Sequence, residues 1–233
     1  MNLARPKTLQ TITARLRQCY RSALPEPIRR VIKDGILGAR GPYTKRFFQE
    51  LDELQDESYS AIAQWLSERF QPTSVLDLGC GTGQLLVAFR KAGVAHCAGT
   101  EFTKYAVRHC RQLGLDVVRA DLCMLLKIDP SMDLTICLEV AEHLPPECAD
   151  QLVANLAGAS GNLVFSAATP GQGGYHHLNE QPQTYWLEKF NKCGWELDSK
   201  ATDEFRRDLA GKNVARWYSN NLMLLQRVSV RKR

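Results

Sequence analysis

The amino-acid sequence predicts an α/β fold built on a doubly wound sheet that is mostly parallel. Short apolar runs alternate with helical patterns along most of the chain, which is typical of parallel strands joined by helices. A glycine-rich turn, "VLDLGCGTGQ" at 75–84, joins the first run to the helix that follows. Acidic residues stand at the ends of successive runs, where such sheets bind their ligands.

The first helix is expected at 48–70, because apolar residues recur there at helical spacing and Pro72 ends the pattern. Its apolar face comprises Leu51, Leu54, Ile62, Trp65 and Leu66. Beyond Pro72, strands are expected at 75–78, 94–100, 117–120, 134–138, 161–166, 195–197 and 221–228. Helices are expected between them at 85–92, at 104–113, after 138 through about 156, and at 184–193.

The last two expected strands differ from the others in their connection. The residues between 197 and 221 show no crossover helix of good amphipathicity. We therefore expect these two strands to pair as an antiparallel edge of the sheet.

The net charge of +5 is unevenly distributed along the chain. Residues 1–47 carry +9, the tail from Leu225 carries +4, and residues 48–224 carry −8. We expect two parts: a basic N-terminal extension or lid at 1–47 and one α/β domain at 48–233. A basic arm on an acidic body favours binding of an anionic partner, such as a carrier molecule or a membrane surface, while nucleic acid is less favoured. The alternative is that the arm binds no partner and packs on the body.

The cysteines and the apolar runs suggest where the protein resides. Eight cysteines occur without a CxxC pair, and most have apolar neighbours, so we expect buried, reduced thiols and no disulfides or zinc site. No apolar run reaches the length of a membrane span, and the basic N-terminus lacks the apolar stretch of a secretory signal. These features predict a cytoplasmic protein.

The glycine turn contains Gly79, Gly81 and Gly83, which let a backbone approach a ligand closely. The spacing is GxGxG rather than the dinucleotide pattern GxGxxG, and no GK[ST] follows as in a P-loop. The residues around the turn must therefore identify the ligand.

Three carboxylates near the ends of successive strands describe that ligand. Asp77 would repel a pyrophosphate but attract a cationic group, and Glu101 ends the second strand, where a carboxylate accepts both ribose hydroxyls. Asp121 can accept a hydrogen bond from an adenine amino group, while Phe102 and Leu122 can pack on the base. Adenine, ribose and a cationic sulfonium occur together in S-adenosylmethionine, which is the cofactor that we expect.

Four stretches in this order resemble the motifs of class I S-adenosylmethionine-dependent methyltransferases. They are "VLDLGCGTG", Glu101, "ADL" at 120–122 and "DLTICLEVAEHL" at 133–144. The resemblance implies a Rossmann-like, seven-stranded sheet whose last strand is antiparallel and inserted. Together with the residues argued above, it gives the expected cofactor-binding set of Asp77, Gly79, Cys80, Gly81, Glu101, Phe102, Asp121, Leu122 and Glu139.

Two stretches offer groups for methyl transfer to an acceptor. "EVAEHLPPE" contains Glu142 and His143 after the fourth strand, and "TPGQGGYHHLNEQPQTYW" contains His177 in a polar, glycine-hinged loop after the fifth. We expect Glu142, His143 and His177 to be the catalytic residues, with a histidine as general base. The pieces "GQGG", "HHLNEQP" and "YWLEKF" are similar to a bacterial subset of small-molecule and glycan methyltransferases.

A metal site is the alternative for the same side chains. Glu139, Glu142, His143 and His177 form a ligand set that suits a divalent metal and resembles the metal site of small-RNA 2′-O-methyltransferases. The "EH" pair also occurs in relatives without a metal, such as ubiquinone-pathway O-methyltransferases, and the loop lacks the rest of the RNA enzymes' pattern. We therefore predict a site without metal.

The preferred function is O-methylation of a small-molecule or sugar hydroxyl. The alternatives are an RNA 2′-O-methyltransferase, possible through the basic arm but disfavoured by the acidic body, and a non-catalytic cofactor-binding subunit, disfavoured by the intact glycine turn. "EVAEHLPP" stands where N-methyltransferases often carry an "NPPY"-like stretch, which disfavours methylation of amide or base nitrogens.

Overall fold

The computed structural model describes residues 43, 45–128, 131–159, 161–210, 212 and 214–228. The chain divides into two units at Thr44 and Lys45, so the helix expected from residue 48 begins the second unit at Lys45. The basic extension lies almost wholly outside the described residues, as does the end of the basic tail. Its expected role as a lid stays a prediction.

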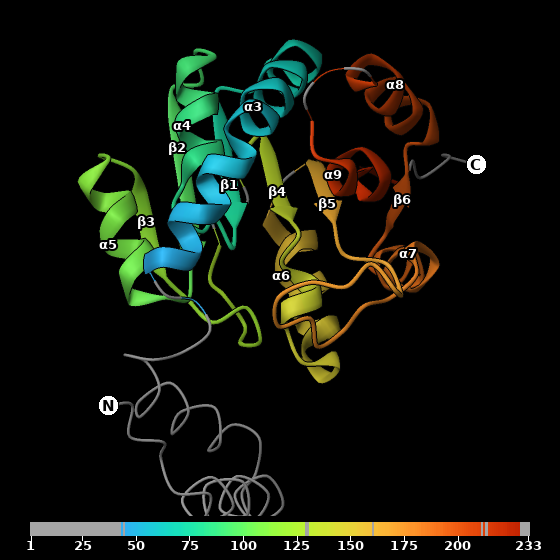
Figure 1. Ribbon diagram of the computed structural model, residues 1–233. Helices are drawn as coiled ribbons and strands as arrows, with labels where there is room; N and C mark the ends of the chain where they lie inside the picture. Colours follow the sequence, from blue (N-terminus) through green and yellow to red (C-terminus); the bar gives the residue numbers. More distant parts are fainter. Residues whose placement is uncertain are drawn as a thin grey trace, which may run out of the picture. The chain divides into compact units, whose positions relative to one another are not determined.

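Seven strands form one sheet whose order is β3-β2-β1-β4-β5-β7-β6. Figure 1 shows the sheet running from β3 in green to β6 in orange. Strand β7 is antiparallel to both β5 and β6, while the other recorded pairs are parallel. This architecture confirms the predicted fold class, including the antiparallel strand. The strands are β1 (Ser74–Leu78), β2 (His96–Glu101), β3 (Asp116–Arg119), β4 (Leu134–Leu138), β5 (Asn162–Ser166), β6 (Trp195–Leu197) and β7 (Met223–Arg227).

Helices cover both faces of the sheet, as alternating strand side chains require. Apolar side chains of α3, α4, α5, α8 and α9 pack on one face, and those of α6 and α7 on the other. Within the described residues, no helix combines the length and apolarity needed to span a membrane. The helices are α3 (Lys45–Phe70), α4 (Gln84–Lys91), α5 (Lys104–Gln112), α6 (Ala149–Ala159), α7 (Gln183–Lys192), α8 (Ser199–Leu209) and α9 (Arg216–Asn221), with short 3₁₀ turns η1 (Ala141–His143) and η2 (Pro146–Cys148).

The strand order reverses on either side of β1, which positions the site. Strand β1 pairs with β2 on one side and with β4 on the other, so the connections from these strands run in opposite directions. Ligands of doubly wound sheets bind outside the carboxyl ends of the strands at such a point. The glycine turn and the segment after β4 both begin there.

The prediction that no amphipathic helix connects the last two strands is wrong. Helix α8 lies between them and buries Ala201, Phe205 and Leu209, which recur at a spacing of four residues. Its N-terminus is capped by Asp198, whose carboxylate accepts a hydrogen bond from the Ala201 N–H at 2.9 Å. The apolar stripe is hard to recognise in the sequence because it is narrow and most of the other residues of α8 are charged or polar.

The expected strand at 221–228 also starts too early. Asn221 ends the short helix α9, and β7 begins at Met223. The antiparallel pairing of β6 with β7 is nevertheless confirmed.

The prediction that the cysteines are all reduced is wrong for one pair. Cys123 and Cys148 form a disulfide between the segment after β3 and η2. Both segments reach the carboxyl edge of the sheet, and only the folded topology brings them together. Four free cysteines are buried as expected, namely Cys80, Cys97, Cys110 and Cys137, whereas the free Cys193 is exposed.

Replacing Phe205 by alanine tests the packing of α8. The Phe205 ring is fully buried and meets the Trp65 ring of α3 edge-on, with 5.2 Å between the ring centroids. We expect Phe205→Ala to lower the free energy of unfolding by about 3–5 kcal/mol, measured by urea denaturation. Asp203→Ala, on the exposed face of the same helix, should change it by less than about 0.5 kcal/mol. Equal losses for the two variants would contradict the packing.

Candidate functional site

The glycine turn after β1 is fixed to the end of β2 by its backbone. The N–H groups of Gly79 and Cys80 both donate to the carbonyl oxygen of Thr100, at 2.9 and 3.0 Å. Gly79 has a φ of +88°, and a Cβ there would lie 2.7 Å from a methyl carbon of Val140. Glycine is required at this position for both reasons, so the turn can close only without a side chain.

Two buried carboxylates flank this turn. Glu101 accepts a hydrogen bond from the Thr103 N–H at 2.6 Å through Oε1, and one from the Gly81 N–H at 3.2 Å through Oε2. Burial raises the pKa of Glu101, and burial together with the nearby Glu101 carboxylate raises the pKa of Asp77 to about 7. Asp77 and Glu101, which are predicted to bind the cationic group and the ribose of a ligand, therefore lie together at the ends of β1 and β2.

The other residues expected to bind the cofactor follow β2 and β3. Phe102 lies under the guanidinium of Arg119, which is 5.4 Å from the ring centroid. The Asp121 carboxylate accepts a hydrogen bond from the Cys123 N–H at 2.9 Å, and the Leu122 side chain is buried in the core. These residues follow the ends of β2 and β3 at the carboxyl edge of the sheet, as the sequence predicted.

Cys80 lies in the turn, but its side chain points into the core. The side chain is buried and belongs to the cluster under α3 and α4. A hydrogen bond with the Cys110 thiol and burial raise the pKa of the Cys80 thiol well above its usual range. Cys80 can therefore contact a ligand only through its backbone atoms.

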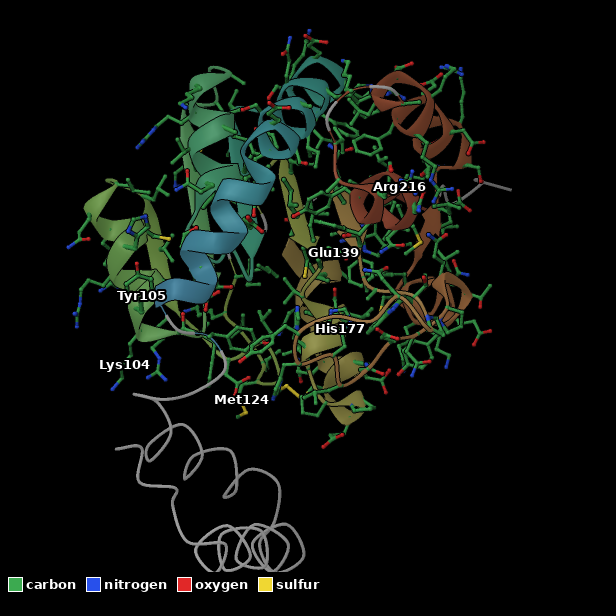
Figure 2. All side chains as sticks on the ribbon, in the orientation of Figure 1. Lys104, Tyr105, Met124, Glu139, His177 and Arg216 are labelled. Atoms are coloured by element: carbon green, nitrogen blue, oxygen red, sulfur yellow. A yellow bond between two sulfur atoms is a disulfide. The ribbon has the colours of Figure 1, made fainter. Side chains whose placement is uncertain are left out.

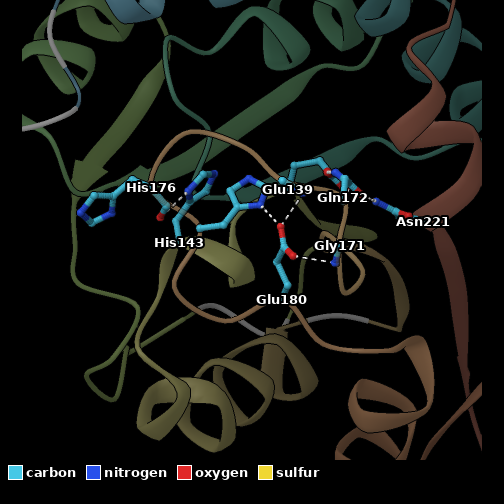
Figure 3. A network of polar contacts seen from close by, with 9 residues as sticks. Glu139, His143, Gly171, Gln172, His176, Glu180 and Asn221 are labelled. Atoms are coloured by element: carbon cyan, nitrogen blue, oxygen red, sulfur yellow. Dashed lines mark hydrogen bonds and ion pairs between the residues drawn. The ribbon is translucent and has the colours of Figure 1, made fainter.

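Glu139 occupies a strained position after β4 and is held by two amide side chains. Its φ is +52°, and its N–H donates to both the carbonyl and the hydroxyl oxygen of Ser166, each at 3.1 Å. Gln172 donates to its Oε2 at 3.2 Å and Asn221 to its Oε1 at 3.3 Å. Asn221 also donates to Gln172 at 2.8 Å, and Figure 3 shows these three side chains together.

The sequence reasoning did not single out Gln172 or Asn221. Asn221 was placed in a strand, and no local pattern relates α9 to the segment after β4.

The structure brings the three expected catalytic residues together, and we call them the Glu142–His143–His177 cluster. Their ligand atoms all lie within 4.8 Å of one another. The two imidazole rings meet edge-on, with 5.0 Å between the centroids. Figure 2 shows His177 close to Glu139 at this edge of the sheet.

Backbone hydrogen bonds hold the loop after β5 against η1. The Glu142 carbonyl oxygen accepts from the N–H groups of Leu178 and Asn179, at 2.7 and 3.0 Å. Nδ1 of His143 faces the carbonyl oxygen of His176 at 3.4 Å. Two main-chain hydrogen bonds and one contact of the His143 side chain therefore hold His177 at the cluster.

Glu180 orients His177 and also stabilises the loop. Its Oε1 lies 2.7 Å from Nδ1 of His177, and its two oxygens accept hydrogen bonds from the N–H groups of Gly171 and Gly173. Figure 3 shows the Glu180 carboxylate at the centre of this network. The His177 hydrogen bond lowers the pKa of Glu180, with the Gly171 N–H as the next cause. The sequence reasoning missed Glu180, although a carboxylate three residues after a histidine in a glycine-rich loop was a usable signal.

Burial dominates the electrostatics of the cluster. It raises the pKa of Glu142 well above its usual range, with the Glu139 carboxylate as the second cause. Burial and the neighbouring His177 lower the pKa of His143 to about 4. The cluster therefore disfavours charge on both groups, and His143 is a neutral imidazole at neutral pH.

Residues 75–159 match the family model described as "Methyltransferase domain". This range contains the glycine turn, Glu101, Asp121 and the segment after β4. By sequence, this part of the chain is similar to methyltransferase domains. The seven-stranded sheet with its antiparallel β7 agrees with that assignment.

Two related sequences are similar to part of this chain. The ubiquinone biosynthesis O-methyltransferase of Neisseria meningitidis serogroup C (strain 053442) is 32% identical over 152 residues, which cover 61% of this chain and 60% of that protein. The ribosomal protein L11 methyltransferase of Lactobacillus johnsonii (strain CNCM I-12250 / La1 / NCC 533) is 32% identical over 103 residues, which cover 41% of this chain and 31% of that protein. The chain thus spans less than two thirds of the length of either relative.

A solved structure shows the same fold over a longer range. Magnesium protoporphyrin IX methyltransferase from Synechocystis PCC 6803, crystallised with bound SAH, has a TM-score of 0.57 and 19% sequence identity. The match covers 92% of this chain and 99% of that protein. At this level of identity, the likeness supports the fold.

Asp77→Asn tests the protonation of the buried carboxyl group. The pKa of Asp77 is raised from 3.8 to about 7 on folding, so folding takes up a proton between these values and stability falls as pH rises through them. Relative to wild type, Asp77→Asn should gain on the order of 3 kcal/mol in free energy of unfolding between pH 4.5 and 7.5. Urea denaturation at both pH values measures the gain.

The exposed Asp116 provides the matched control for this measurement. Asp116→Asn should not reproduce the gain, because its carboxyl group lies in solvent. A difference between Asp77→Asn and wild type that is the same at both pH values would contradict the raised pKa.

Proposed function

We propose that this chain transfers a methyl group from S-adenosylmethionine to a hydroxyl group of a small-molecule or sugar acceptor. The observation that carries the proposal is the Glu142–His143–His177 cluster, which stands beside the predicted cofactor residues at one edge of the sheet. An oxygen acceptor must lose its proton during transfer, and the cluster offers groups that accept it. The name of the Neisseria meningitidis relative, an O-methyltransferase, also supports an oxygen acceptor.

The residues of the glycine turn fit the cofactor in shape. Because Gly79 has no Cβ, the turn can close against Val140, which occupies the space that a side chain would need. The turn therefore offers its main chain to the amino-acid end of the cofactor, and the buried Asp77 carboxylate suits a cationic group there.

The carboxylates after β2 and β3 fit the nucleoside. The Glu101 carboxylate accepts hydrogen bonds from the N–H groups of Thr103 and Gly81, and each carboxylate oxygen can accept more than one hydrogen bond, so ribose hydroxyls can bind as well. Asp121 would accept from the adenine amino group, and Phe102 and Leu122 would pack on the base. The Synechocystis structure, which contains SAH on the same fold, supports S-adenosylmethionine as the cofactor.

Methyl transfer needs little from the protein beyond position and one proton acceptor. The bound cofactor supplies a methyl group on a sulfonium, and the sulfur keeps the electron pair of the broken C–S bond as a thioether. The cluster holds the acceptor oxygen in line with that bond and takes the hydroxyl proton as the new O–C bond forms. Glu180 keeps the His177 ring oriented for this purpose.

Exposed apolar side chains in two loops at the carboxyl edge of the sheet favour an acceptor with an apolar part. Met124 and Leu125 after β3, and Tyr175 and Leu178 after β5, are exposed large apolar side chains.

We further propose that the basic extension at 1–47 binds an anionic carrier of the acceptor or a membrane surface, with nucleic acid less favoured. A cytoplasmic location stays part of this proposal.

Cofactor binding tests the first half of the proposal. Calorimetric titration with S-adenosylmethionine and S-adenosylhomocysteine should show binding of both. Glu101→Ala should weaken it by about 1–3 kcal/mol, because hydrogen bonds to a charged group are lost. Asp116→Ala, which removes an exposed carboxylate from the start of β3, should bind like wild type. Unchanged affinity in Glu101→Ala would show that the ribose assignment is wrong.

Turnover on hydroxyl acceptors tests the second half. Formation of S-adenosylhomocysteine should be followed with a panel of phenols, sugars and aliphatic alcohols. His177→Ala should lower kcat by about 10²–10⁴-fold with unchanged cofactor affinity, whereas His96→Ala, at the opposite end of β2, should be normal. Turnover only with amine acceptors, or a fully active His177→Ala variant, would refute O-methylation by this cluster.

A further inference from the structure

The segment that follows Asp121 has no regular secondary structure. We call residues 122–126 the adenine segment, because Asp121 and Leu122 are the proposed adenine-binding residues. The segment opens with a turn in which the Met124 N–H donates to the Asp121 carbonyl oxygen at 3.0 Å. Ordering such a segment costs conformational entropy, so it keeps one path only if other parts of the protein hold it.

One buried amide side chain of α6 holds the adenine segment along its whole length. Nδ2 of Asn155 donates to the carbonyl oxygens of Leu122 and Met124, at 3.2 and 2.9 Å. Oδ1 of Asn155 accepts a hydrogen bond from the Leu126 N–H at 3.0 Å. All three contacts are to main-chain atoms, so they fix the path of the backbone rather than a single side chain.

The hydrogen-bonding capacity of Asn155 is fully used. The residue is 3% exposed, and its Oδ1 also accepts a hydrogen bond from Nε2 of Gln151, one turn earlier on α6, at 3.1 Å. A side-chain amide has two N–H donors and two acceptor lone pairs, and each of them has a partner here. Three of these four bonds connect α6 to the adenine segment.

The disulfide between Cys123 and Cys148 is a second attachment of the same segment. Cys148 is the last residue of η2 and directly precedes α6. Met124 and the disulfide are both visible in Figure 2. The adenine segment is therefore held twice, by the hydrogen bonds of Asn155 and by a covalent bond to the turn before α6.

The direction of the Asp121 carboxylate depends on the adenine segment. Its Oδ1 accepts a hydrogen bond from the Cys123 N–H at 2.9 Å, and its carbonyl oxygen accepts the one from Met124. Both donors belong to the segment, and so does the buried Leu122 side chain. A displaced segment would therefore turn the carboxylate and move the apolar surface on which the base packs.

We infer that Asn155 is a positioning residue for the adenine of the cofactor. It acts through the adenine segment, which it holds so that Asp121 and Leu122 meet the base in one geometry. This inference deepens the proposed function and rests on it for the place of the adenine. A segment that is ordered before binding spares the cofactor the cost of ordering it, so affinity and selectivity for the base both depend on Asn155.

Selectivity for the base distinguishes this role from a general contribution to stability. The full chain is titrated by calorimetry with S-adenosylhomocysteine and with S-inosylhomocysteine, which carries a carbonyl oxygen in place of the adenine amino group. Wild type should bind the adenine compound at least tenfold more tightly, because the Asp121 carboxylate repels a carbonyl oxygen. Asn155→Ala should reduce this ratio to about threefold or less and weaken binding of S-adenosylhomocysteine at least tenfold.

A second variant and a matched control accompany Asn155→Ala. Asn155→Asp keeps the size of the side chain but turns an oxygen toward two carbonyl oxygens, so it should lose selectivity as well. Asn162→Ala removes an amide that also donates to a main-chain carbonyl, that of Asp133, at the opposite edge of the sheet. It should keep the selectivity of wild type, and circular dichroism should show that all three variants are folded.

Each titration is made with the disulfide intact and again after reduction with dithiothreitol. Reduction removes the second attachment, so the loss of selectivity in Asn155→Ala should be larger in the reduced protein. Wild type should keep its selectivity after reduction, because Asn155 still holds the segment.

The possible outcomes separate this inference from the proposed function. Wild-type selectivity in Asn155→Ala and Asn155→Asp, in both oxidised and reduced protein, overturns the positioning role and leaves the proposed function intact. A loss confined to the reduced variants supports the role, since the disulfide then holds the segment alone in the oxidised protein. Equal affinity of wild type for the two ligands refutes the adenine placement and this inference together, whereas failure of wild type to bind either ligand refutes the proposed function itself.

Discussion

Two N–H groups share the carbonyl oxygen of Thr100, and the rest of the site depends on this contact. It closes the glycine turn onto the end of β2, so Asp77 and Glu101 are held next to each other. The closure is possible only because Gly79 has no side chain to meet Val140, the residue that follows Glu139. The proposed cofactor half of the site (Asp77 and Glu101) and its proposed acceptor half (Glu139 and Glu142) therefore meet at one glycine.

Several carboxyl groups of the site are buried and therefore lack stabilisation by water. Asp77 and Glu101 are buried together at the cofactor half, and Glu142 lies beside Glu139 at the acceptor half. Burial opposes the ionisation of Asp77, Glu101 and Glu142, and this costs folding free energy where the unfolded chain would be ionised. Such perturbed groups are common where a protein must bind charge, and here both halves favour a positively charged ligand.

The sequence predicted features that depend on neighbouring residues. The strands followed from short apolar runs, and the glycine turn from its spacing, because each is determined within about ten residues. The three catalytic candidates were predicted to act together, and the structure places them within 4.8 Å of one another. Helix α8 was missed because its three buried residues, Ala201, Phe205 and Leu209, stand among many charges. Gln172 and Asn221 were missed because their partner, Glu139, lies far away along the chain.

The disulfide between Cys123 and Cys148 encloses a covalent ring in the chain. That ring includes β4 together with Glu139, Glu142 and His143, and it begins two residues after Asp121. The segment that carries Glu139, Glu142 and His143 is thus closed into one loop, whose ends cannot separate even if its hydrogen bonds break. A local opening of this region must keep Cys123 and Cys148 together, so the segment after β4 can move away from the sheet only as part of this loop.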